Sequence, residues 1–366
     1  MESIEIMYRT SEKYAEMTCV SVASVMANTK RNVRVHIFEH ELTNDTKERI
    51  LQLEKMYPHG RIEFHHISND EAALIRRTVP DETLERWTIT EFFNAFMMNH
   101  LKGISKVISF GSDIVVDSDL SAFYDLDISN NYAIAHDYAP MLRYLFKYPP
   151  HYDSPRSAIN LFLMEMFVSH IGIDEMIYNL DELRKNGVFD DFLEDKYPRY
   201  INEVKRAFET AEHYFPHLFK KTGSASCPFP SFFSAEMFQS SLFEKKVILM
   251  PEEFCCPPPL CYEFVSNSQY KPVIYHMFGL NKPAFIGQND IILPYNYELY
   301  FKYKRMSPYA DDVGDKRLLD EYKNRINAIM SVIRSAKHKL PAELQMHYDK
   351  EKLLEAFLYD NVKQAA

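Results

Sequence analysis

The first seventy residues alternate between apolar runs of strand length and segments whose apolar residues have helical spacing. The apolar runs lie at 4–8, 33–38 and 62–67, and the helical patterns lie between them at 17–26 and 44–56. The first kind of pattern predicts β-strands and the second predicts amphipathic helices. Strands and helices in this order predict a mainly parallel sheet with helices on both faces. We therefore expect an α/β fold.

A glycine and an aspartate interrupt the most apolar part of the chain. Residues 106–116 are almost continuously apolar except at Gly111-Ser112-Asp113. A parallel strand that ends at such a break presents the next residues at the carboxyl edge of the sheet, where α/β proteins bind ligands. Asp113 is therefore a candidate binding residue. The alternative interpretation is a loop aspartate that caps a turn.

Composition excludes several functional classes. The chain has 42 Lys and Arg against 52 Asp and Glu, a formal net charge of −10, which argues against a nucleic-acid-binding protein with a basic surface. None of the glycines are spaced as GxGxxG or GxxxxGK, so we expect neither a classical dinucleotide site nor a P-loop. The N-terminus lacks the regions of a secretory signal, and no apolar run reaches the roughly 20 residues of a membrane span. We expect a cytoplasmic protein.

The middle of the chain has weaker patterns. Residues 87–101 predict one helix. Residues 137–226 are irregular and rich in Pro, Tyr and His, apart from a strand at 176–180 and a helix before Asn186. This segment predicts an insertion that shapes one side of a cleft.

A basic segment lies near the C-terminus. In residues 316–339 the apolar residues recur at helical spacing, with seven Lys and Arg against two acids. Such a helix would make peripheral contact with an anionic surface, such as the inner face of a membrane, or would pack on its own domain with its basic face in solvent. We expect one domain over residues 1–290 and a helical C-terminal extension over residues 291–366.

Four segments, taken in order, resemble the family 8 glycosyltransferases across about residues 4–285. They are residues 9–15, 106–120, 178–180 and 276–283. The last segment matches the family's HxxGxxKP signature. The resemblance implies a GT-A fold, with three α/β/α layers. It also implies retaining transfer of a hexose from a nucleotide-diphosphate sugar, expected to be a UDP-sugar, to a glycan or lipid-linked saccharide acceptor.

The resemblance also implies roles for individual residues. In the family, a DxD motif and a distant histidine hold Mn²⁺ on the diphosphate, and Asp113 and His276 stand at matching positions. Gly279 and Lys282 match residues that contact the phosphates, and Tyr14 matches the residue that lies against the uracil ring. This chemistry needs cations, because negative charge develops on the diphosphate leaving group.

The sequence departs from the family at several donor-binding positions. Gly111 replaces the first aspartate of the DxD motif and Ser112 is its middle residue, so the expected metal site keeps one of two carboxylates. Ser11 stands where the family has an acid that contacts uracil, and Asn94 stands where an arginine near the donor sugar is typical. Glu236 is the only carboxylate near the later DQD motif, which lies beside the anomeric carbon, so it is the catalytic candidate.

Two further features bear on the metal. A different segment, near residues 170–174, stands where the family has an FNAG turn. Asp117 and Asp119 spell DxD literally, but they lie past the break, so we interpret them as the entry to a helix before Leu120. They are nevertheless the first candidates to replace the missing ligand. Restoring an aspartate at position 111 is expected to tighten metal binding unless Gly111 has a positive φ.

Two functional interpretations follow from these residues. The favoured one is an active hexosyltransferase with an altered donor site and a weak dependence on metal, because the phosphate-binding segment is intact. The alternative is a catalytically impaired family member that binds a sugar nucleotide or a glycan. A scaffold that docks other enzymes has no support in the sequence beyond the basic segment.

Overall fold

The five strands and helices that the sequence predicts for the N-terminal part are all present. The computed structural model describes residues 2–136, 171–214, 216, 233–243, 246–251, 254–256, 273–277, 294–311, 314–317, 320 and 324. The five elements are β1 (Ile4–Thr10), α1 (Ala15–Asn28), β2 (Val33–Glu39), α2 (Asn44–Met56) and β3 (Gly60–His66).

A short 3-10 helix, η1 (Glu12–Tyr14), lies between β1 and α1. Beyond β3, strands and helices alternate less regularly. The elements between β3 and residue 136 are α3 (Asn69–Thr78), α4 (Asp81–Trp87), the 3-10 helix η2 (Ile89–Phe96), α5 (Met97–His100), β4 (Lys106–Phe110), β5 (Ile114–Val116), α6 (Ser121–Tyr124) and β6 (Ala133–Ala135). Those after residue 170 are β7 (Glu175–Asn179), α9 (Leu180–Lys185), the π-helix η3 (Phe192–Lys196), α10 (Tyr197–Tyr214), α12 (Ala235–Phe243), β8 (Val247–Leu249), β9 (Cys255–Cys256), β10 (Ile274–His276) and α14 (Pro294–Lys304).

The main sheet has seven strands in the order β3-β2-β1-β4-β7-β6-β8. Strands β3, β2, β1 and β4 run parallel to one another, whereas β7 is antiparallel to both β4 and β6. A smaller sheet has the order β5-β10-β9, with β10 antiparallel to β5. The predicted, mainly parallel sheet is therefore confirmed.

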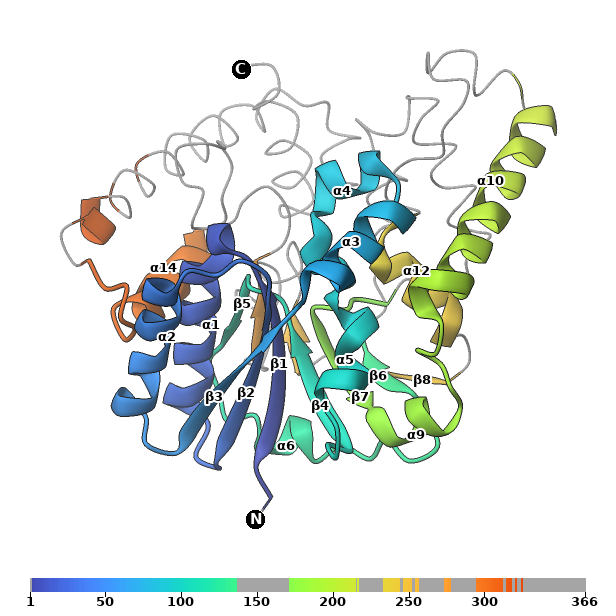
Figure 1. Cartoon of the computed structure of the whole chain (residues 1–366). Helices are drawn as coiled ribbons and strands as arrows, with labels where there is room; N and C mark the ends of the chain where they lie inside the picture. The colour runs from blue at the N-terminus through green and yellow to red at the C-terminus, as the bar shows by residue number, and fades with distance from the viewer. Residues whose placement is uncertain are drawn as a thin grey trace, which may run out of the picture.

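Alternate side chains of β1 enter two different apolar cores. Ile6 and Tyr8 pack with residues of α1 and α2. Met7 points to the opposite face and packs with residues of α3 and α5. Figure 1 shows these helices on the two sides of the sheet, which confirms the three-layer α/β/α prediction. Because both faces are covered, the central strands β1 and β4 are buried along almost their whole length.

The prediction of one helix over residues 87–101 is wrong. Helix α4 ends at Trp87, and Thr88 has a φ of 66°, which is incompatible with a continuous right-handed helix. The chain then continues as η2 and α5. Helix α3 was not predicted, although Ser68 and Glu71 form a capping box at its start, with the side chain of each bonded to the backbone of the other.

The prediction that residues 137–226 are irregular is also wrong where the structure describes them. Residues 137–170 and 217–232 lie outside the described residues. The part between them contains the predicted strand β7 and helix α9, followed by the 18-residue helix α10. Tyr197 and Tyr200 of α10 pack against the ring of Phe238 on α12. These aromatic contacts hold α10 to the core.

Helix α14, in the expected C-terminal extension, packs beside α1. The side-chain amide of Asn28 donates hydrogen bonds to the carbonyl of Val116 at 2.9 Å and to the hydroxyl of Tyr303 at 2.7 Å. The Tyr303 hydroxyl in turn donates to the carboxylate of Asp117. Helix α14 is thereby joined to the end of β5.

The predicted basic helix over residues 316–339 lies outside the described residues except at positions 316, 317, 320 and 324. Its membrane contact therefore stays a prediction. Across the described ranges, no helix combines the length and apolar character needed to cross a membrane.

We predict that Tyr303→Phe lowers the free energy of unfolding by about 1–3 kcal/mol, because Asp117 loses a buried hydrogen-bond donor. Chemical denaturation measures this change. Tyr214→Phe is the matched control: Tyr214 is 69% exposed, so its hydroxyl should matter by less than about 0.5 kcal/mol. Equal effects of the two variants would contradict the contact between α14 and β5.

Candidate active site

The loop between β4 and β5 is fixed by hydrogen bonds from three other segments. The hydroxyl of Ser112 accepts a hydrogen bond from the hydroxyl of Thr18 at 2.9 Å and donates one to the carbonyl of Arg9 at 3.2 Å. The carbonyl of Asp113 accepts a hydrogen bond from the N–H of Met277 at 2.8 Å. The position of Asp113 is therefore set by α1, β1 and the end of β10.

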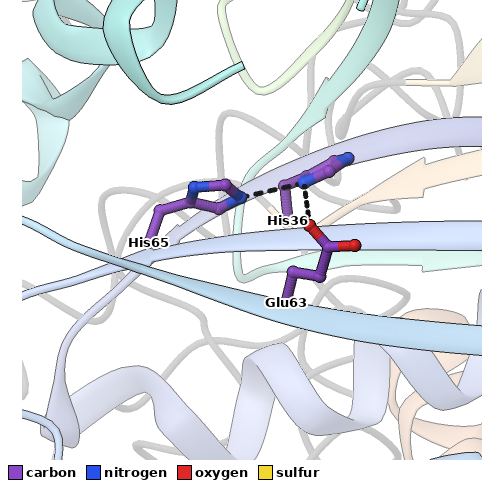
Figure 2. Close-up of side chains that lie close together, drawn as sticks. All are labelled: His36, Glu63 and His65. Atoms are coloured by element: carbon purple, nitrogen blue, oxygen red, sulfur yellow. Dashed lines mark hydrogen bonds and ion pairs between the residues drawn. The ribbon is translucent and has the colours of Figure 1, made fainter. Parts of the chain in front are cut away.

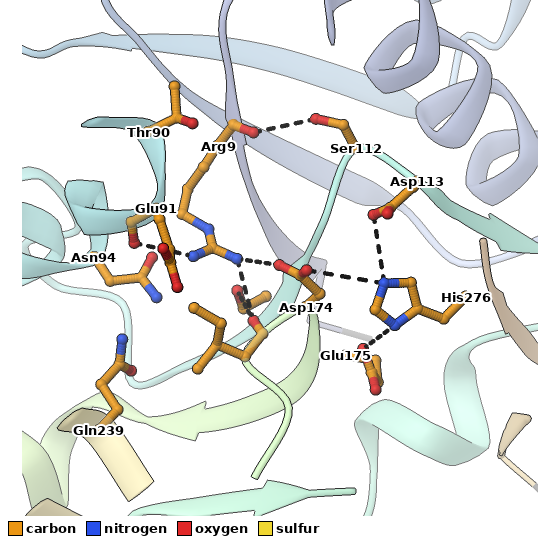
Figure 3. Close-up of polar contacts among 12 residues, drawn as sticks. Arg9, Thr90, Glu91, Asn94, Ser112, Asp113, Asp174, Glu175, Gln239 and His276 are labelled. Atoms are coloured by element: carbon orange, nitrogen blue, oxygen red, sulfur yellow. Dashed lines mark hydrogen bonds and ion pairs between the residues drawn. The ribbon is translucent and has the colours of Figure 1, made fainter. Parts of the chain in front are cut away.

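Asp113, Asp174 and His276 converge with their side chains (Figure 3). Nε2 of His276 lies 3.5 Å from Oδ1 of Asp113 and 3.9 Å from Oδ2 of Asp174. One ligand atom from each of the three residues lies within 4.8 Å of the others. Asp113 and His276 are buried, whereas the side chain of Asp174 is 35% exposed, so solvent reaches the group from its side. We call these three residues the Asp-Asp-His cluster.

Strand register accounts for this convergence. Strand β10 pairs with β5 so that His276 lies opposite Ile114, next to Asp113. Strand β4 pairs with β7 so that Phe110 lies opposite Glu175. One position further along the chain, the N–H of Gly111 donates to the carbonyl of Asp174 at 2.9 Å. Residues more than 160 positions apart thus meet at one edge of the sheet.

Glu175 lies behind the imidazole of His276. Its Oε2 is 3.0 Å from Nδ1 of the ring, which leaves Nε2 facing the two aspartates. Burial alone would lower the pKa of His276, but the carboxylates of Glu175 and Asp113 outweigh it and raise the pKa well above its usual value. A metal ion that binds Nε2 would replace the proton held there.

The donor set of the Asp-Asp-His cluster suits a divalent cation. It offers two carboxylates and one imidazole, with a third carboxylate behind the imidazole, the arrangement that orients histidine ligands in metal sites. The acids outnumber the cationic groups, so negative charge is in excess. The residues present therefore fit the metal that the sequence implies.

Arg9 holds Asp174 from the side opposite His276. Its guanidinium forms an ion pair with Oδ1 of Asp174 and also donates to the carbonyl of Glu91 at 3.2 Å. The Arg9 side chain is almost completely buried. The cation therefore restricts Asp174 and neutralises part of its charge.

Two glutamates, Glu91 and Glu236, lie next to each other near Arg9. Glu236 is partly exposed in the first turn of α12, and its backbone N–H bonds to the carboxyl group of Glu91. Burial, followed by the negative charge of Glu236, raises the pKa of Glu91 to about 8. Glu91 is thus mostly protonated at neutral pH.

A comparison with models of protein families identifies the family to which this chain belongs. The model of glycosyl transferase family 8 matches residues 5–211, more than half of the chain. The chain belongs to this family. The family assignment makes it a glycosyltransferase. A search of curated proteins finds no match.

Solved structures of glycosyltransferases share the fold of this family 8 chain. An active-site mutant of LgtC aligns with 16% identity and a TM-score of 0.52, covering 76% of this chain and 89% of the other. The galactosyltransferase LgtC in complex with donor and acceptor sugar analogues aligns with 13% identity and a TM-score of 0.51 over the same shares. The bifunctional glycosyltransferase WbbM aligns with 14% identity and a TM-score of 0.57, covering 86% of this chain and 51% of WbbM. These similarities show that the chain has the GT-A fold.

The structure of this family 8 chain brings some of the predicted site residues together and places others elsewhere. Asp113 and His276 come together, and Glu236 lies beside Glu91. Ser11 precedes η1 and Tyr14 is its last residue, directly after β1. Gly279 and Lys282, and with them most of the HxxGxxKP signature, lie outside the described residues.

Asn94 lies in a buried network. Its side chain is fully buried, and its amide donates to the hydroxyl of Tyr178 at 3.0 Å, which donates in turn to Gln239 at 2.6 Å. Figure 3 shows the Arg9 guanidinium between Asn94 and the Asp-Asp-His cluster. Arg9 therefore supplies a cation beside the position where the family typically has an arginine. Arg9 begins the first of the four segments that carry the family resemblance, but the resemblance assigned it no role.

The structure argues against the expected effect of restoring an aspartate at position 111. Gly111 does not have a positive φ. A Cβ atom at this position would, however, lie 2.7 Å from Cγ of Asp174 and 2.8 Å from Oδ1 of Asp113. The space of the missing carboxylate is already filled by another carboxylate, that of Asp174.

Asp117 and Asp119 have other partners. Asp117 accepts hydrogen bonds from Lys302, at 2.6 Å, and from Tyr303. Asp119 accepts one from the N–H of Ser121 at 2.8 Å, at the start of α6, as expected of a residue at the entry to a helix. The structure therefore favours Asp174 over both as the replacement ligand. The sequence signal was the acid in residues 170–174, in the segment that replaces the FNAG turn.

We predict that the stability of the chain depends on pH through Glu91. Its pKa is about 8 in the folded chain against a usual value of 4.5, so the folded state retains a proton that the unfolded state releases. This contribution to stability is complete below about pH 4.5 and is lost as the pH rises through 8. Glu91→Gln keeps the neutral form, so its stability relative to the parent should rise with pH by up to about 1.4 kcal/mol per pH unit.

Denaturation series at several pH values measure this difference. Glu209→Gln, at an exposed position of α10, is the control and should follow the parent at every pH. A constant difference between Glu91→Gln and the parent from pH 5 to pH 8 would contradict the raised pKa.

Proposed function

We propose that this family 8 glycosyltransferase moves a hexose from a UDP-sugar to a hydroxyl group of a saccharide acceptor, with retention of anomeric configuration. The observation that carries the proposal is the Asp-Asp-His cluster, which gathers two carboxylates and an imidazole at the carboxyl edge of the sheet. Ligands of α/β proteins bind at this edge. In the reaction, the bond from the anomeric carbon to the diphosphate breaks, and the proton of the acceptor hydroxyl leaves with UDP.

Asp113, Asp174 and His276 would hold a divalent cation at the diphosphate. Carboxylate oxygens and a single imidazole favour Mn²⁺ or Mg²⁺, with Mn²⁺ the better match for a site that includes nitrogen. When bound, the ion stabilises the negative charge of the departing UDP. Glu175 would keep Nε2 of His276 directed at the ion.

The neighbouring side chains divide into charged and neutral groups. Arg9 offsets the charge of Asp174, and Glu91 adds no negative charge while it is protonated. Glu236 is therefore the ionised carboxylate expected beside the anomeric carbon, where it would stabilise the positive charge that develops as the glycosidic bond breaks. Ser11 and Tyr14, which follow β1, would contact the uridine.

The second metal-binding carboxylate comes from the residue before β7 in this chain, and not from the loop after β4. Family members carry it at the position of Gly111, and this chain carries it on Asp174, whose carbonyl accepts the Gly111 N–H. Because Gly111 has no side chain, the carboxylate of Asp174 fits beside it. This exchange supports an active site with a complete set of ligands over a degenerate one.

Incubation with UDP-glucose and UDP-galactose in the presence of Mn²⁺ tests the proposal. The parent should release UDP from at least one of them, and Asp174→Asn should reduce both this release and the affinity of the UDP-bound protein for Mn²⁺, the latter by about tenfold or more. Calorimetry measures the affinity. Asp119→Asn is the control and should change neither. Binding of both UDP-sugars without release of UDP, with or without saccharide acceptors, would favour the alternative of a sugar-nucleotide-binding protein.

The exchange of positions can be reversed. Gly111→Asp alone should weaken Mn²⁺ binding, because its side chain collides with Asp174. Asp174→Gly alone should also weaken it, because one carboxylate is lost. The double variant, Gly111→Asp with Asp174→Gly, should bind Mn²⁺ more tightly than Asp174→Gly does. If the double variant and Asp174→Gly have the same affinity in calorimetry, the two positions do not share one ligand role.

A further inference from the structure

Two histidines and a glutamate meet on one face of the sheet, on strands that do not contribute to the Asp-Asp-His cluster (Figure 2). Glu63 and His65 lie two residues apart on β3, so their side chains point to the same face. His36, on the neighbouring strand β2, lies opposite Glu63. Nδ1 of His36 is 2.9 Å from Nε2 of His65 and 3.8 Å from Oε2 of Glu63.

A fourth residue orients His36. Nε2 of His36 lies 2.8 Å from Oε2 of Glu5, on β1. A carboxylate oxygen accepts hydrogen bonds, so the Nε2–H tautomer of His36 suits Glu5, and in this tautomer Nδ1 presents its lone pair to His65 and Glu63. A carboxylate behind a histidine fixes the tautomer of metal-binding histidines in the same way.

The surroundings restrain all of these groups. His36 is only 1% exposed. The ring of His65 stacks on Phe38, with 5.0 Å between ring centroids, and meets the edge of His100 at 5.7 Å. Arg34 lies 3.9 Å from Oε1 of Glu5 and 3.7 Å from Oε1 of Glu63, which leaves Oε2 of each glutamate directed at His36.

We propose that His36, Glu63 and His65, the His-Glu-His cluster, bind a divalent transition-metal ion of the Zn²⁺ type. Ligand atoms around tetrahedral zinc, with bonds of about 2.0–2.1 Å, lie about 3.3 Å apart. The separations of 2.9 Å and 3.8 Å lie on either side of this value. The side chain of Glu63 is 52% exposed, so water reaches the fourth position.

The two clusters differ in the ions they favour. Two imidazoles and one carboxylate suit Zn²⁺, Co²⁺ or Ni²⁺, whereas a site rich in oxygen suits Mn²⁺ or Mg²⁺. The His-Glu-His cluster also has a distinct structural consequence. Strand β3 is at the edge of the main sheet, and an ion held by His36 and His65 would join it to β2. Zinc would therefore stabilise the folded chain by mass action, independently of UDP-sugar binding.

Titration of the full chain with Zn²⁺, without UDP, tests this proposal. The His276→Gln variant removes the histidine of the Asp-Asp-His cluster, and calorimetry should still detect one zinc ion per chain. Adding His65→Gln should weaken binding by about tenfold or more, and Glu5→Gln, which only orients His36, should weaken it about 10- to 100-fold. His66→Gln is the matched control, because His66 lies next to His65 on the opposite face of β3.

Thermal unfolding supplies a second measurement on the otherwise unaltered chain. With Mn²⁺ in excess to occupy the Asp-Asp-His cluster, zinc should raise the unfolding midpoint of the parent and of His66→Gln by clearly more than that of His65→Gln. Midpoints without zinc establish that each variant is folded. Equal losses in His65→Gln and His66→Gln, or no zinc binding by His276→Gln, would overturn the proposal. Neither result would affect the proposed transferase activity, which depends on other residues.

Discussion

The pairing register between β4 and β7 is the constraint on which the candidate active site depends. Phe110 lies opposite Glu175, so Asp174 comes beside Gly111 and its carboxylate reaches Asp113 and His276. A shift of one residue would send the side chains of β7 to the other face of the sheet. The apolar residues of β7 are buried against the cores on both faces, and their burial opposes such a shift. Packing far from the cluster therefore fixes its geometry.

Charge imposes the second constraint on this edge of the sheet. Asp113, Asp174 and Glu175 approach one imidazole, and like charges at such distances oppose one another. Arg9 relieves part of the repulsion through its ion pair with Asp174. Protonation relieves another part at Glu91. The remaining negative charge attracts a cation, which connects the stability of the fold with the chemistry we propose.

The sequence predicted the N-terminal fold closely, because that part obeys local rules. Helix α2 has the predicted bounds, and β1, β2 and β3 differ from theirs by a few residues. The break before Thr88 was not predictable from apolar spacing, since it depends on one backbone angle. The capping box of α3, by contrast, was visible in the sequence and was missed.

The candidate site was less predictable, since its members come from distant strands. Asp113 was indicated by the break in its apolar run and His276 by a resemblance to a family, and the contact between them needed the β5–β10 pairing. Asp174 was missed because no pattern in residues 170–174 reveals that it fills the space beside Gly111. Asn94 lies in a buried network that its neighbours in the sequence do not reveal.

The place of β10 in the chain order has a consequence for biosynthesis. A ribosome completes β1 to β7, with all three acids of the site, about a hundred residues before it adds His276. During that interval Asp113, Asp174 and Glu175 face one another without the imidazole. The growing chain must hold them together through the β4–β7 pairing, the contacts of Ser112 with α1 and β1, and the ion pair of Arg9 with Asp174. Strand β10 then pairs with β5 and supplies the group that all three acids face.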